Sequence, residues 1–393
     1  MSAAITPFVV DIPQPALDDL RERLLRTRWP QEIGDNADWQ AGTNLAYMRE
    51  LTTHWIERYD WRAQERAMNA FPQFRTTIDE VPIHFVHVPG KGVPGGSSPI
   101  PLIVNHGWPW TFWDMRKIIG PLTDPAAHGG SAEDAFEVIA PSLPGFAFSS
   151  PLEKPGIYFS PTADLWAKLM TRLGHERFAT QGGDIGAFVS AMLGHKYADR
   201  VIGTHLHLLS PLKVPYPAAE DFAPDEAEWG KKGAAFFAEG SAYMQIQRTR
   251  PQTISFAMND SPVGLAAWLI DKRRAWSDCG GDVEAVFSKD DLITSAMLYW
   301  LTETYESSAR HYYEARPENF AAAFVHDRVP VVEAPTAALQ FKGDVWLQPR
   351  KWAERYYNLK RWTVVEKGGH FAPMEAPEVL IEDLRAFLRP LRG

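Results

Sequence analysis

The chain has 393 residues, of which 45% are hydrophobic and 23% are charged, and its formal net charge at pH 7 is −9. This composition is typical of a soluble globular protein, and the negative charge argues against nucleic acid or an anionic membrane surface as a partner. The single cysteine, Cys279, excludes an internal disulfide framework and fits a reducing compartment. We therefore expect a cytoplasmic protein with one large core and an inserted module.

The sequence predicts no membrane anchor. Its first residues lack the basic and apolar regions of a signal peptide. The longest uncharged stretch, residues 94–113, contains Pro, Gly, Ser, Asn and His, and such a segment cannot span a bilayer.

The first 75 residues are expected to form helices that wrap a larger domain. Apolar side chains recur at helical spacing over residues 16–27 and again over residues 45–59. An irregular stretch that contains tryptophan separates the two segments. Short amphipathic helices gain most of their stability from packing, so these segments must rest on another part of the chain.

Short strands that alternate with helices are expected from residue 76 onward. The first two strands alternate apolar and polar residues, whereas residues 101–106 form the continuous apolar run of a buried parallel strand. The expected strands are 76–79, 83–88, 101–106, 136–140, 178–181 and 201–208, with helices at 162–173 and 186–197. This alternation predicts an α/β fold whose central sheet is mostly parallel.

Residues 212–320 interrupt the alternation and fit helices, which predicts a helical cap inserted into the sheet domain. The helical stretches include 240–250, 262–276 and 291–313; strands return at 336–341 and 362–365, and a final helix covers about 376–390. The expected parts are a wrapping segment at 1–75, the first part of the core at 76–211, the cap at 212–320 and the second part of the core at 321–393.

A Gly-x-Asp-x-Gly pattern stands at Gly182, Asp184 and Gly186. Its spacing is that of a nucleophile elbow, the tight strand-to-helix turn of the α/β-hydrolase fold. Glycines on both sides relieve the crowding around a strained nucleophile. The same residues also fit a simple turn.

An aspartate in place of the usual serine changes the chemistry of such an elbow. A carboxylate is ionised at pH 7 and needs no base to activate it. It would attack a saturated carbon and leave an alkyl ester on Asp184. The candidate substrates are therefore epoxides and alkyl halides rather than esters and amides.

A second motif, His106-Gly107-Trp108-Pro109, follows an expected strand and precedes the elbow in the chain. In the α/β-hydrolase fold a loop at this place contributes a backbone N–H to the oxyanion hole. The N–H groups of Trp108 and Ile185 are the expected donors. The loop also fits a plain Trp-Pro turn with a cis bond.

His370 follows the last expected strand, in Gly-Gly-His-Phe, which is the place of the general base in this fold. The histidine needs a carboxylate that fixes its tautomer and stabilises its positive charge. Asp344, directly after the preceding strand, has the most suitable position. Glu333, Glu366 and Glu375 are alternatives that also fit surface or loop positions.

Together these motifs resemble the epoxide hydrolases of the α/β-hydrolase fold, and most closely their microsomal-type branch. The matching stretches cover nearly the whole chain, at 15–30, 106–109, 181–186, 243–253, 260–268, 297–302, 310–314 and 368–371. The resemblance implies that Asp184 opens an epoxide ring and that His370, oriented by Asp344, activates a water that releases a vicinal diol. The sequence shows no metal-ligand cluster and no phosphate-binding glycine loop, so no metal ion and no cofactor are expected.

The resemblance also implies roles for two tyrosines of the cap. Tyr243 and Tyr312 stand at the family positions whose phenols donate hydrogen bonds to the epoxide oxygen. A phenol with a pKa of roughly 10 keeps its proton at pH 7 and suits this task. Tyr313 and Tyr305 are alternatives for the second position. Because successive helix positions point about 100° apart, only one of Tyr312 and Tyr313 can face the site.

The sequence departs from the family pattern in two respects. Microsomal relatives carry an N-terminal membrane anchor, whereas this chain begins at the wrapping segment and resembles a soluble bacterial or fungal relative. Many of them use glutamate as the third triad member, whereas Asp344 is one methylene shorter. The shorter acid bears on the turnover rate rather than on the mechanism.

Two other functions share part of this pattern. A haloalkane or haloacid dehalogenase uses the same Asp–His pair but needs halide-binding donors in place of the tyrosines. A non-catalytic binding protein on this scaffold would keep the pocket without turnover.

The expected partners are a small-molecule epoxide and water, and a homodimer would be unsurprising. Trp108, Trp110 and Trp113 fit either a pocket for a bulky or aromatic epoxide or ordinary core packing. The resemblance implies a role in detoxification or in natural-product biosynthesis, but the residues leave the individual epoxide and the stereochemistry open.

Overall fold

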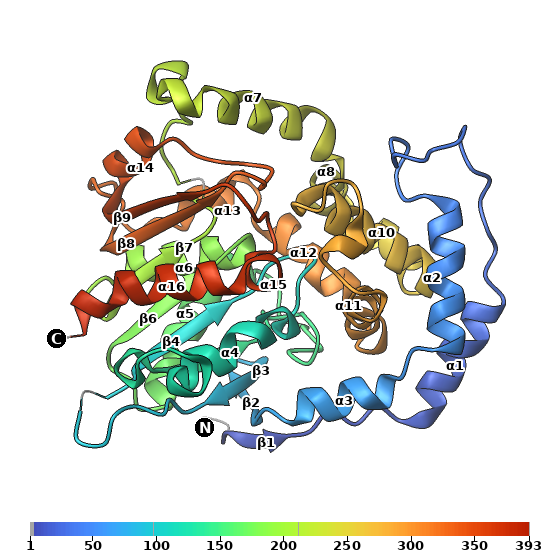
Figure 1. Ribbon diagram of the computed structural model, residues 1–393, viewed down its shortest axis with the longest axis horizontal. Helices are drawn as coiled ribbons and strands as arrows, with labels where there is room; N and C mark the ends of the chain where they lie inside the picture. The colour runs from blue at the N-terminus through green and yellow to red at the C-terminus, as the bar shows by residue number, and fades with distance from the viewer. Residues whose placement is uncertain (1–3, 97, 211, 393) are drawn as a thin grey trace.

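The computed structural model describes residues 4–96, 98–210 and 212–392, which are organised around one sheet (Figure 1). Within these residues the sheet has nine strands in the order β1-β2-β3-β5-β4-β6-β7-β8-β9. The strands are β1 (Thr6–Phe8), β2 (Gln73–Ile78), β3 (Val81–Val88), β4 (Ile100–Asn105), β5 (Phe136–Pro141), β6 (Phe178–Gly182), β7 (Val201–Leu206), β8 (Val332–Phe341) and β9 (Tyr357–Val365). The pairs that join β1, β2, β3 and β5 are antiparallel and all others are parallel, so the expected mostly parallel α/β sheet is confirmed.

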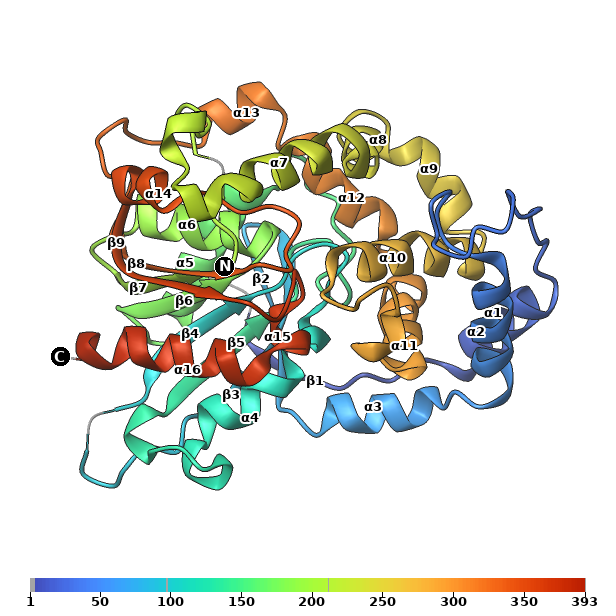
Figure 2. The same ribbon diagram turned by 45° about the horizontal axis from the view of Figure 1, so that its top comes forward.

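Helices cover both faces of the sheet. α4 (Arg116–Thr123) and α16 (Pro377–Leu388) lie on one face, and α5 (Phe159–Arg172) and α6 (Ile185–Lys196) lie on the other (Figures 1 and 2). α6 begins directly after the Gly-Gly-Asp turn and carries no charged residue before its last turn. A helix that is apolar on all sides must be buried, and α6 packs between the sheet and α5.

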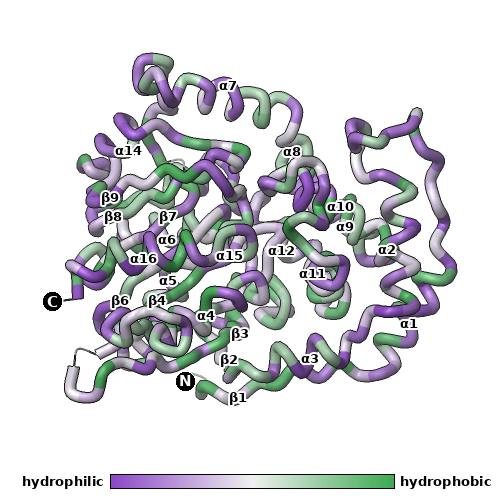
Figure 3. The backbone as a smooth tube through the Cα atoms, viewed as in Figure 1, coloured by the Kyte–Doolittle hydropathy of each residue, from purple (hydrophilic) through white to green (hydrophobic). Residues whose placement is uncertain are grey.

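The cap lies between β7 and β8. Its helices are α7 (Ala227–Ala235), α8 (Ala242–Thr249), α9 (Pro251–Met258), α10 (Pro262–Trp276), α11 (Lys289–Leu301), α12 (Tyr305–Glu314) and α13 (Pro317–Ala322). Hydrophilic and hydrophobic residues alternate along α7, as in a helix with one apolar face (Figure 3). Within the described part of the chain, no helix has both the length and the apolar character that a bilayer crossing requires.

The N-terminal segment wraps around the cap. It contains α1 (Gln14–Leu25), α2 (Leu45–Glu57) and α3 (Trp61–Asn69), and α1 and α2 lie beside α10 and α11 (Figures 1 and 2). Thr43 Oγ1 donates a hydrogen bond to the Ala267 carbonyl oxygen at 2.8 Å, and His54 Nε2 lies 2.7 Å from Asp290 Oδ1. The segment therefore contacts the cap, while β1 joins it to the edge of the sheet.

The elements that the sequence pattern does not predict include β1, α3, α4 and α14 (Arg350–Tyr356). The prediction of a single helix over residues 291–313 is wrong, because α11 and α12 are separate helices. They are separated at Glu303, whose φ of +54° is left-handed and ends a helix without the usual glycine or proline.

The ends of the expected parts do not all coincide with the ends of elements. Residue 75 lies inside β2 and residue 320 lies inside α13. Residue 211 lies outside the described residues.

Candidate active site

The residues with expected catalytic roles gather at one edge of the sheet. β4, β6, β8 and β9 are parallel, so their carboxyl ends lie at the same edge. The loops that follow these four strands carry Trp108, Asp184, Asp344 and His370. In open α/β sheets, ligands bind at this edge.

Asp184 occupies the turn between β6 and α6, with φ +50° and ψ −130°. This backbone conformation is strained for a residue with a side chain. Glycine is required on both sides of it. A Cβ at Gly182 would lie 2.2 Å from the Gly186 carbonyl oxygen, and a Cβ at Gly186 would lie 2.2 Å from the Asn105 carbonyl oxygen. These contacts are those of a nucleophile elbow rather than of a simple turn.

One of the two expected oxyanion donors contacts the Asp184 side chain. The Trp108 N–H donates a hydrogen bond to Asp184 Oδ1 at 2.7 Å, and the Trp108–Pro109 peptide bond is cis. Ile185 is the first residue of α6, where N–H groups have no partner within the helix. Its role as the second donor stays a prediction.

His106 stabilises the loop that carries this donor. Its Nε2 accepts the Leu143 N–H at 3.0 Å, so the proton of the neutral ring is on Nδ1, which donates to the Gly107 carbonyl oxygen at 2.9 Å. Burial lowers the pKa of His106 to about 4. The ring is therefore neutral at pH 7 and holds the loop in place.

His370 lies between two carboxylates. Its Nδ1 is 2.9 Å from Asp344 Oδ1, and its Nε2 is 3.4 Å from Asp184 Oδ2. The side chain of His370 is only 4% exposed. Asp344 Oδ1 also accepts the Val345 N–H at 2.6 Å, which fixes the carboxylate. The structure thus brings together the three residues that the sequence singles out.

The two carboxylates change the acidity of His370. Burial alone would lower the pKa of the imidazole, but the charges of Asp344 and Asp184 and the hydrogen bonds to both acids outweigh it and raise the pKa to about 10. The His370 ring is therefore protonated at pH 7.

The alternative acids do not contact the imidazole. Glu333 forms an ion pair with Arg328 at 2.9 Å, and Glu366 forms one with Lys342 at 2.7 Å. Both pairs lie at the surface, as expected for structural charges. Glu375 is closer, but its carboxylate accepts the backbone N–H groups of Phe371 and Asp278 rather than a proton of the imidazole.

Glu375 and Asp278 connect the His370 loop to the cap. Glu375 Oε1 accepts the Phe371 N–H at 2.7 Å, and its Oε2 accepts the Asp278 N–H at 2.8 Å. Asp278 Oδ2 in turn accepts the Gly368 N–H at 3.0 Å. These bonds fix the backbone on both sides of His370, and the sequence motifs do not identify either acid as a support for this loop.

Replacing Glu375 with glutamine is expected to lower kcat by about tenfold with little change in KM, because one of its two backbone bonds is lost and the base shifts. Burial, opposed by the two backbone hydrogen bonds, raises the pKa of Glu375 to about 7. In the unmodified protein, kcat should therefore fall as the pH drops through 7 by more than the protonation of His370 alone explains, and this additional decline should be absent in the variant. Glu366→Gln at the surface is the control, and identical pH profiles for all three proteins would contradict the role.

Tyr243 of α8 and Tyr312 of α12 lie together near Asp184. Their ring centroids are 5.8 Å apart, and Trp108 stacks on Tyr243 at 5.1 Å. Burial and the charge of Asp184 raise the pKa of Tyr243, and burial together with Tyr243 and Asp184 raises the pKa of Tyr312. Both phenols therefore keep their protons at pH 7. Among the described residues, no group meets the Tyr312 hydroxyl at hydrogen-bonding geometry.

The alternative tyrosines have other surroundings. Tyr313 is 37% exposed, and the Arg316 guanidinium lies 4.8 Å from its ring centre. Tyr305 is buried, with its hydroxyl 3.5 Å from Gln247 Oε1. Of Tyr312 and Tyr313, Tyr312 is therefore the one that packs against Tyr243.

Trp276 borders the site but is not singled out by the sequence. Its ring lies 5.1 Å from that of His370 and 5.0 Å from that of Tyr243, and its carbonyl oxygen accepts the His370 N–H at 3.0 Å. It is the last residue of α10, so the cap contacts His370 directly. In the sequence, the one feature that points to Trp276 is its position as an aromatic residue at the end of an expected cap helix.

The three tryptophans of the Trp108 loop differ in position. Trp110 has its ring 5.6 Å from that of His370, so it and Trp108 both border the site. Trp113 instead packs against Phe71 at 6.0 Å and under the Arg116 guanidinium at 5.2 Å. Core packing therefore accounts for Trp113.

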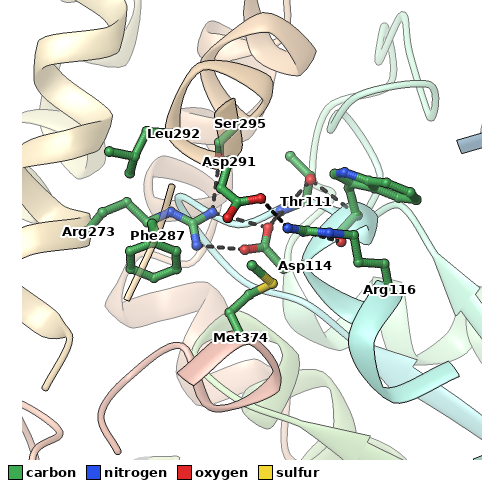
Figure 4. A pocket seen from close by; sticks show the side chains of 10 residues that line it. Thr111, Asp114, Arg116, Arg273, Phe287, Asp291, Leu292, Ser295 and Met374 are labelled. Atoms are coloured by element: carbon green, nitrogen blue, oxygen red, sulfur yellow. Dashed lines mark hydrogen bonds and ion pairs between the residues drawn. The ribbon is translucent and has the colours of Figure 1, made fainter. Parts of the chain in front are cut away.

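Arg273 joins the cap to the loop that carries Trp108 (Figure 4). Its guanidinium pairs with Asp114 at 2.6 Å and donates to the Pro109 carbonyl oxygen at 3.1 Å and to Ser295 Oγ at 3.0 Å. The Arg273 side chain is 3% exposed, so this ion pair is buried. Loss of either partner would leave an uncompensated charge in the interior, so the ion pair holds α10 firmly against the loop that carries Trp108.

The cavity beside this ion pair has a volume of ≈ 10 Å³, which is space for about one water. Arg116 and Asp291 form a second ion pair at its edge (Figure 4). The cavity is too small for an epoxide, so this cluster is a contact between cap and core rather than a substrate site.

Comparisons with known proteins agree with this geometry. Residues 5–115 match the family model described as "Epoxide hydrolase N terminus", and residues 100–377 match the model of the "alpha/beta hydrolase fold". The second match spans most of the chain and includes Asp184, Asp344 and His370.

Named relatives align over almost the full length. A putative epoxide hydrolase from Stigmatella aurantiaca is 41% identical over 392 residues, which cover 99% of this chain and 86% of the relative. Epoxide hydrolase 1 from Oryctolagus cuniculus is 36% identical over 98% of this chain and 89% of its own. The crystal structure of juvenile hormone epoxide hydrolase from Bombyx mori superposes with a TM-score of 0.90 at 27% identity, covering 99% of this chain and 95% of that one. This chain belongs to the epoxide hydrolase family of the α/β-hydrolase fold.

Proposed function

We propose that this epoxide hydrolase converts its substrate to a vicinal diol in two steps, through a covalent ester on Asp184. The position of His370 carries the proposal, because its ring lies 2.9 Å from Asp344 and 3.4 Å from Asp184. Tyr243 and Tyr312 supply protonated phenols beside the same carboxylate. The site therefore holds a nucleophile, a base and two hydrogen-bond donors for the departing oxygen.

In the first step, Asp184 Oδ2 attacks a ring carbon. Oδ1 is bound to the Trp108 N–H at 2.7 Å, so it becomes the carbonyl oxygen of the ester, and Oδ2 becomes the oxygen bonded to the substrate. The carbon–oxygen bond of the ring breaks as the new bond forms. The ring oxygen gains negative charge, which Tyr243 and Tyr312 stabilise by hydrogen bonding and then neutralise by proton transfer.

In the second step, His370 takes a proton from water through Nε2, and the water oxygen attacks Cγ of Asp184. Negative charge then develops on Oδ1, where the Trp108 N–H stabilises it. The Cγ–Oδ2 bond breaks, and Oδ2 takes the proton back from His370 and leaves as the second hydroxyl of the diol. The remaining proton of the water is released from the new Asp184 carboxyl group, and its transfer to the deprotonated phenol restores the site. The water oxygen stays in the Asp184 carboxylate.

Ester formation also prepares the base. The charge of Asp184 and its hydrogen bond are among the causes that raise the pKa of His370 to about 10, and both are lost when Oδ2 becomes an ester oxygen. Burial, which lowers the pKa, is unchanged. The imidazolium therefore becomes a stronger acid in the ester, and a larger fraction of His370 is neutral and able to act as the base.

Replacing Asp184 with asparagine, which removes the same charge, is expected to lower the pKa of His370 from about 10. NMR titration of the imidazole Cε1–H in both proteins measures the change, with the exposed His128 as an internal reference. An unchanged titration midpoint would contradict the coupling. In the unmodified enzyme, ester hydrolysis should accelerate with rising pH as His370 loses its proton.

A hydrophobic or aromatic epoxide is the proposed substrate class. The rings of Trp108, Trp276, Tyr243 and Tyr312 lie next to one another beside Asp184 and His370. Such surfaces favour apolar groups and leave the two phenols to orient the one polar atom.

A comparison of two substrates tests this proposal against dehalogenase chemistry. Incubation with styrene oxide should give the vicinal diol, whereas a chloroalkane of similar size should release no chloride. The paired phenols suit an oxygen that stays in the product, and the named relatives are epoxide hydrolases. Chloride release without diol formation would overturn the assignment, and the absence of both products would favour a non-catalytic protein.

The four parts, at 1–75, 76–211, 212–320 and 321–393, are proposed as the units of this architecture. The position of α7 to α13 between β7 and β8 supports the cap as an insertion. A cytoplasmic location and a homodimer stay predictions, and light scattering of the purified protein tests the second.

A further inference from the structure

A cluster of two histidines and one glutamate lies outside the active site. His87 Nε2 is 2.6 Å from Glu137 Oε1, and His175 Nε2 is 3.1 Å from the same oxygen. The three potential ligand atoms all lie within 4.8 Å of one another. Within the described part of the chain, no other group of three or more such side chains converges in this way.

The fold brings these residues together from three elements. β3 and β5 are antiparallel with His87 opposite Ile139, so Glu137, two positions from Ile139, is on the same face and diagonally adjacent to His87. His175 lies in the turn between α5 and β6, where its N–H donates to the Met170 carbonyl oxygen at 2.9 Å. Its backbone is therefore held in place.

The cluster lies at the edge of the sheet opposite to the catalytic residues. Glu137 is the second residue of β5, and His175 comes shortly before β6, so both are at the amino ends of parallel strands. Asp184 follows the carboxyl end of β6. The reaction at Asp184 therefore does not account for the cluster.

The surroundings suit a cation. The Glu137 carboxylate contacts both imidazoles, at 2.6 Å from His87 and 3.1 Å from His175, and a carboxylate with two imidazoles offers three ligand atoms to one cation. Phe74 packs against the ring of His87 at 6.1 Å and limits its rotation. The three side chains are 15–23% exposed, which leaves the cluster accessible to an ion from solvent.

We propose that His87, Glu137 and His175 bind one Zn²⁺ ion through two imidazole Nε2 atoms and one carboxylate oxygen, with water as the fourth ligand. Two imidazoles and a carboxylate are a common ligand set for zinc. With metal–ligand bonds of about 2.1 Å, tetrahedral ligands lie about 3.4 Å apart, so the present 2.6 and 3.1 Å separations need only small side-chain shifts.

Zinc bound here would cross-link β3, β5 and the turn before β6. These residues are far apart in the unfolded chain, so the ion would bind the folded state selectively and stabilise it. The catalytic residues lie at the other edge of the sheet, and diol formation should not depend on the ion.

Thermal unfolding of the full-length protein with and without ZnCl₂, after treatment with a chelator, tests the proposal. At zinc concentrations well above Kd, we expect Tm to rise by at least about 2 °C. Equilibrium dialysis should find one Zn²⁺ per chain, and Co²⁺ at the same site should give the visible absorption of a tetrahedral complex.

The variants His87→Ala and His175→Ala should each lose both the rise in Tm and the bound zinc, with unchanged diol formation. His54→Ala is a matched control, since His54 also pairs with a carboxylate, at 2.7 Å from Asp290, but lies outside the cluster. It should retain the zinc response. No rise in Tm in the unmodified protein, or an equal rise in all variants, would overturn the proposal.

Discussion

Replacing Asp184 with asparagine is expected to reduce diol formation by on the order of 10⁴-fold or more. The asparagine amide carries no charge and is a poor nucleophile, so the first step fails. Its side-chain oxygen can still accept the Trp108 N–H, which donates to Asp184 Oδ1 at 2.7 Å, and the fold should persist. Rapid-quench measurement of diol from styrene oxide, with enzyme in excess, gives the rate directly.

Asp199→Asn is a matched control for this variant, because Asp199 is an exposed aspartate next to α6. It should keep the full rate. Circular dichroism of both variants should match that of the unmodified protein. If the Asp184 variant formed diol at the rate of the unmodified protein, another group would have to open the ring.

The double replacement of Tyr243 and Tyr312 with phenylalanine is expected to slow ring opening by on the order of 10⁴-fold, and each single replacement by on the order of 10²-fold. Each hydroxyl donates to the oxygen as its charge develops, and one remaining donor stabilises part of that charge. Phenylalanine keeps the ring contacts of both residues with Trp108. Single-turnover kinetics separates this effect on ring opening from ester hydrolysis.

Stability provides a check on the tyrosine variants. The Tyr312 hydroxyl has no partner of normal hydrogen-bonding geometry among the described residues, so its removal should change the free energy of unfolding little. Tyr313→Phe changes the neighbouring, 37% exposed phenol and should affect neither rate nor stability. If Tyr313→Phe were slow and Tyr312→Phe normal, the second donor would be misassigned.

Trp108, Asp184 and His370, which are proposed to act in catalysis, could be singled out in the sequence because each stands in a short motif whose requirements are local. Asp184 needs small neighbours, and a Cβ at Gly182 or Gly186 would collide with backbone atoms at 2.2 Å. The α/β topology then brings the ends of parallel strands to one edge. The motif at Asp184 and the position of His370 after the last strand therefore predict a common site even though the residues are far apart in the chain.

The supporting residues were not predictable in the same way. Arg273, Trp276 and Asp278 reach the catalytic loops only because the end of α10 lies against the core, and no local pattern specifies that contact. Glu375 appears in the sequence as one of several acids near His370, and its hydrogen bonds to Phe371 and Asp278 are tertiary.

The presence or absence of local sequence signals also explains where the predicted helices differ from the observed ones. The break between α11 and α12 depends on the left-handed Glu303, a residue type with no preference for that conformation. α3 is different, because Asp60 caps its first turn by accepting the Ala63 N–H at 3.1 Å. An aspartate before Trp61 is a recognisable start signal for that helix.

A single turnover in ¹⁸O-labelled water, with enzyme in excess over styrene oxide, tests the covalent ester on Asp184 most directly. The water oxygen should enter the Asp184 carboxylate, and both oxygens of the diol should be unlabelled, one from the epoxide and one from Asp184 Oδ2. Mass spectrometry of the diol and of the peptide that contains Asp184 reads both outcomes. Labelled diol in the first turnover together with an unlabelled Asp184 peptide would show that water attacks the epoxide directly, and it would contradict the ester mechanism.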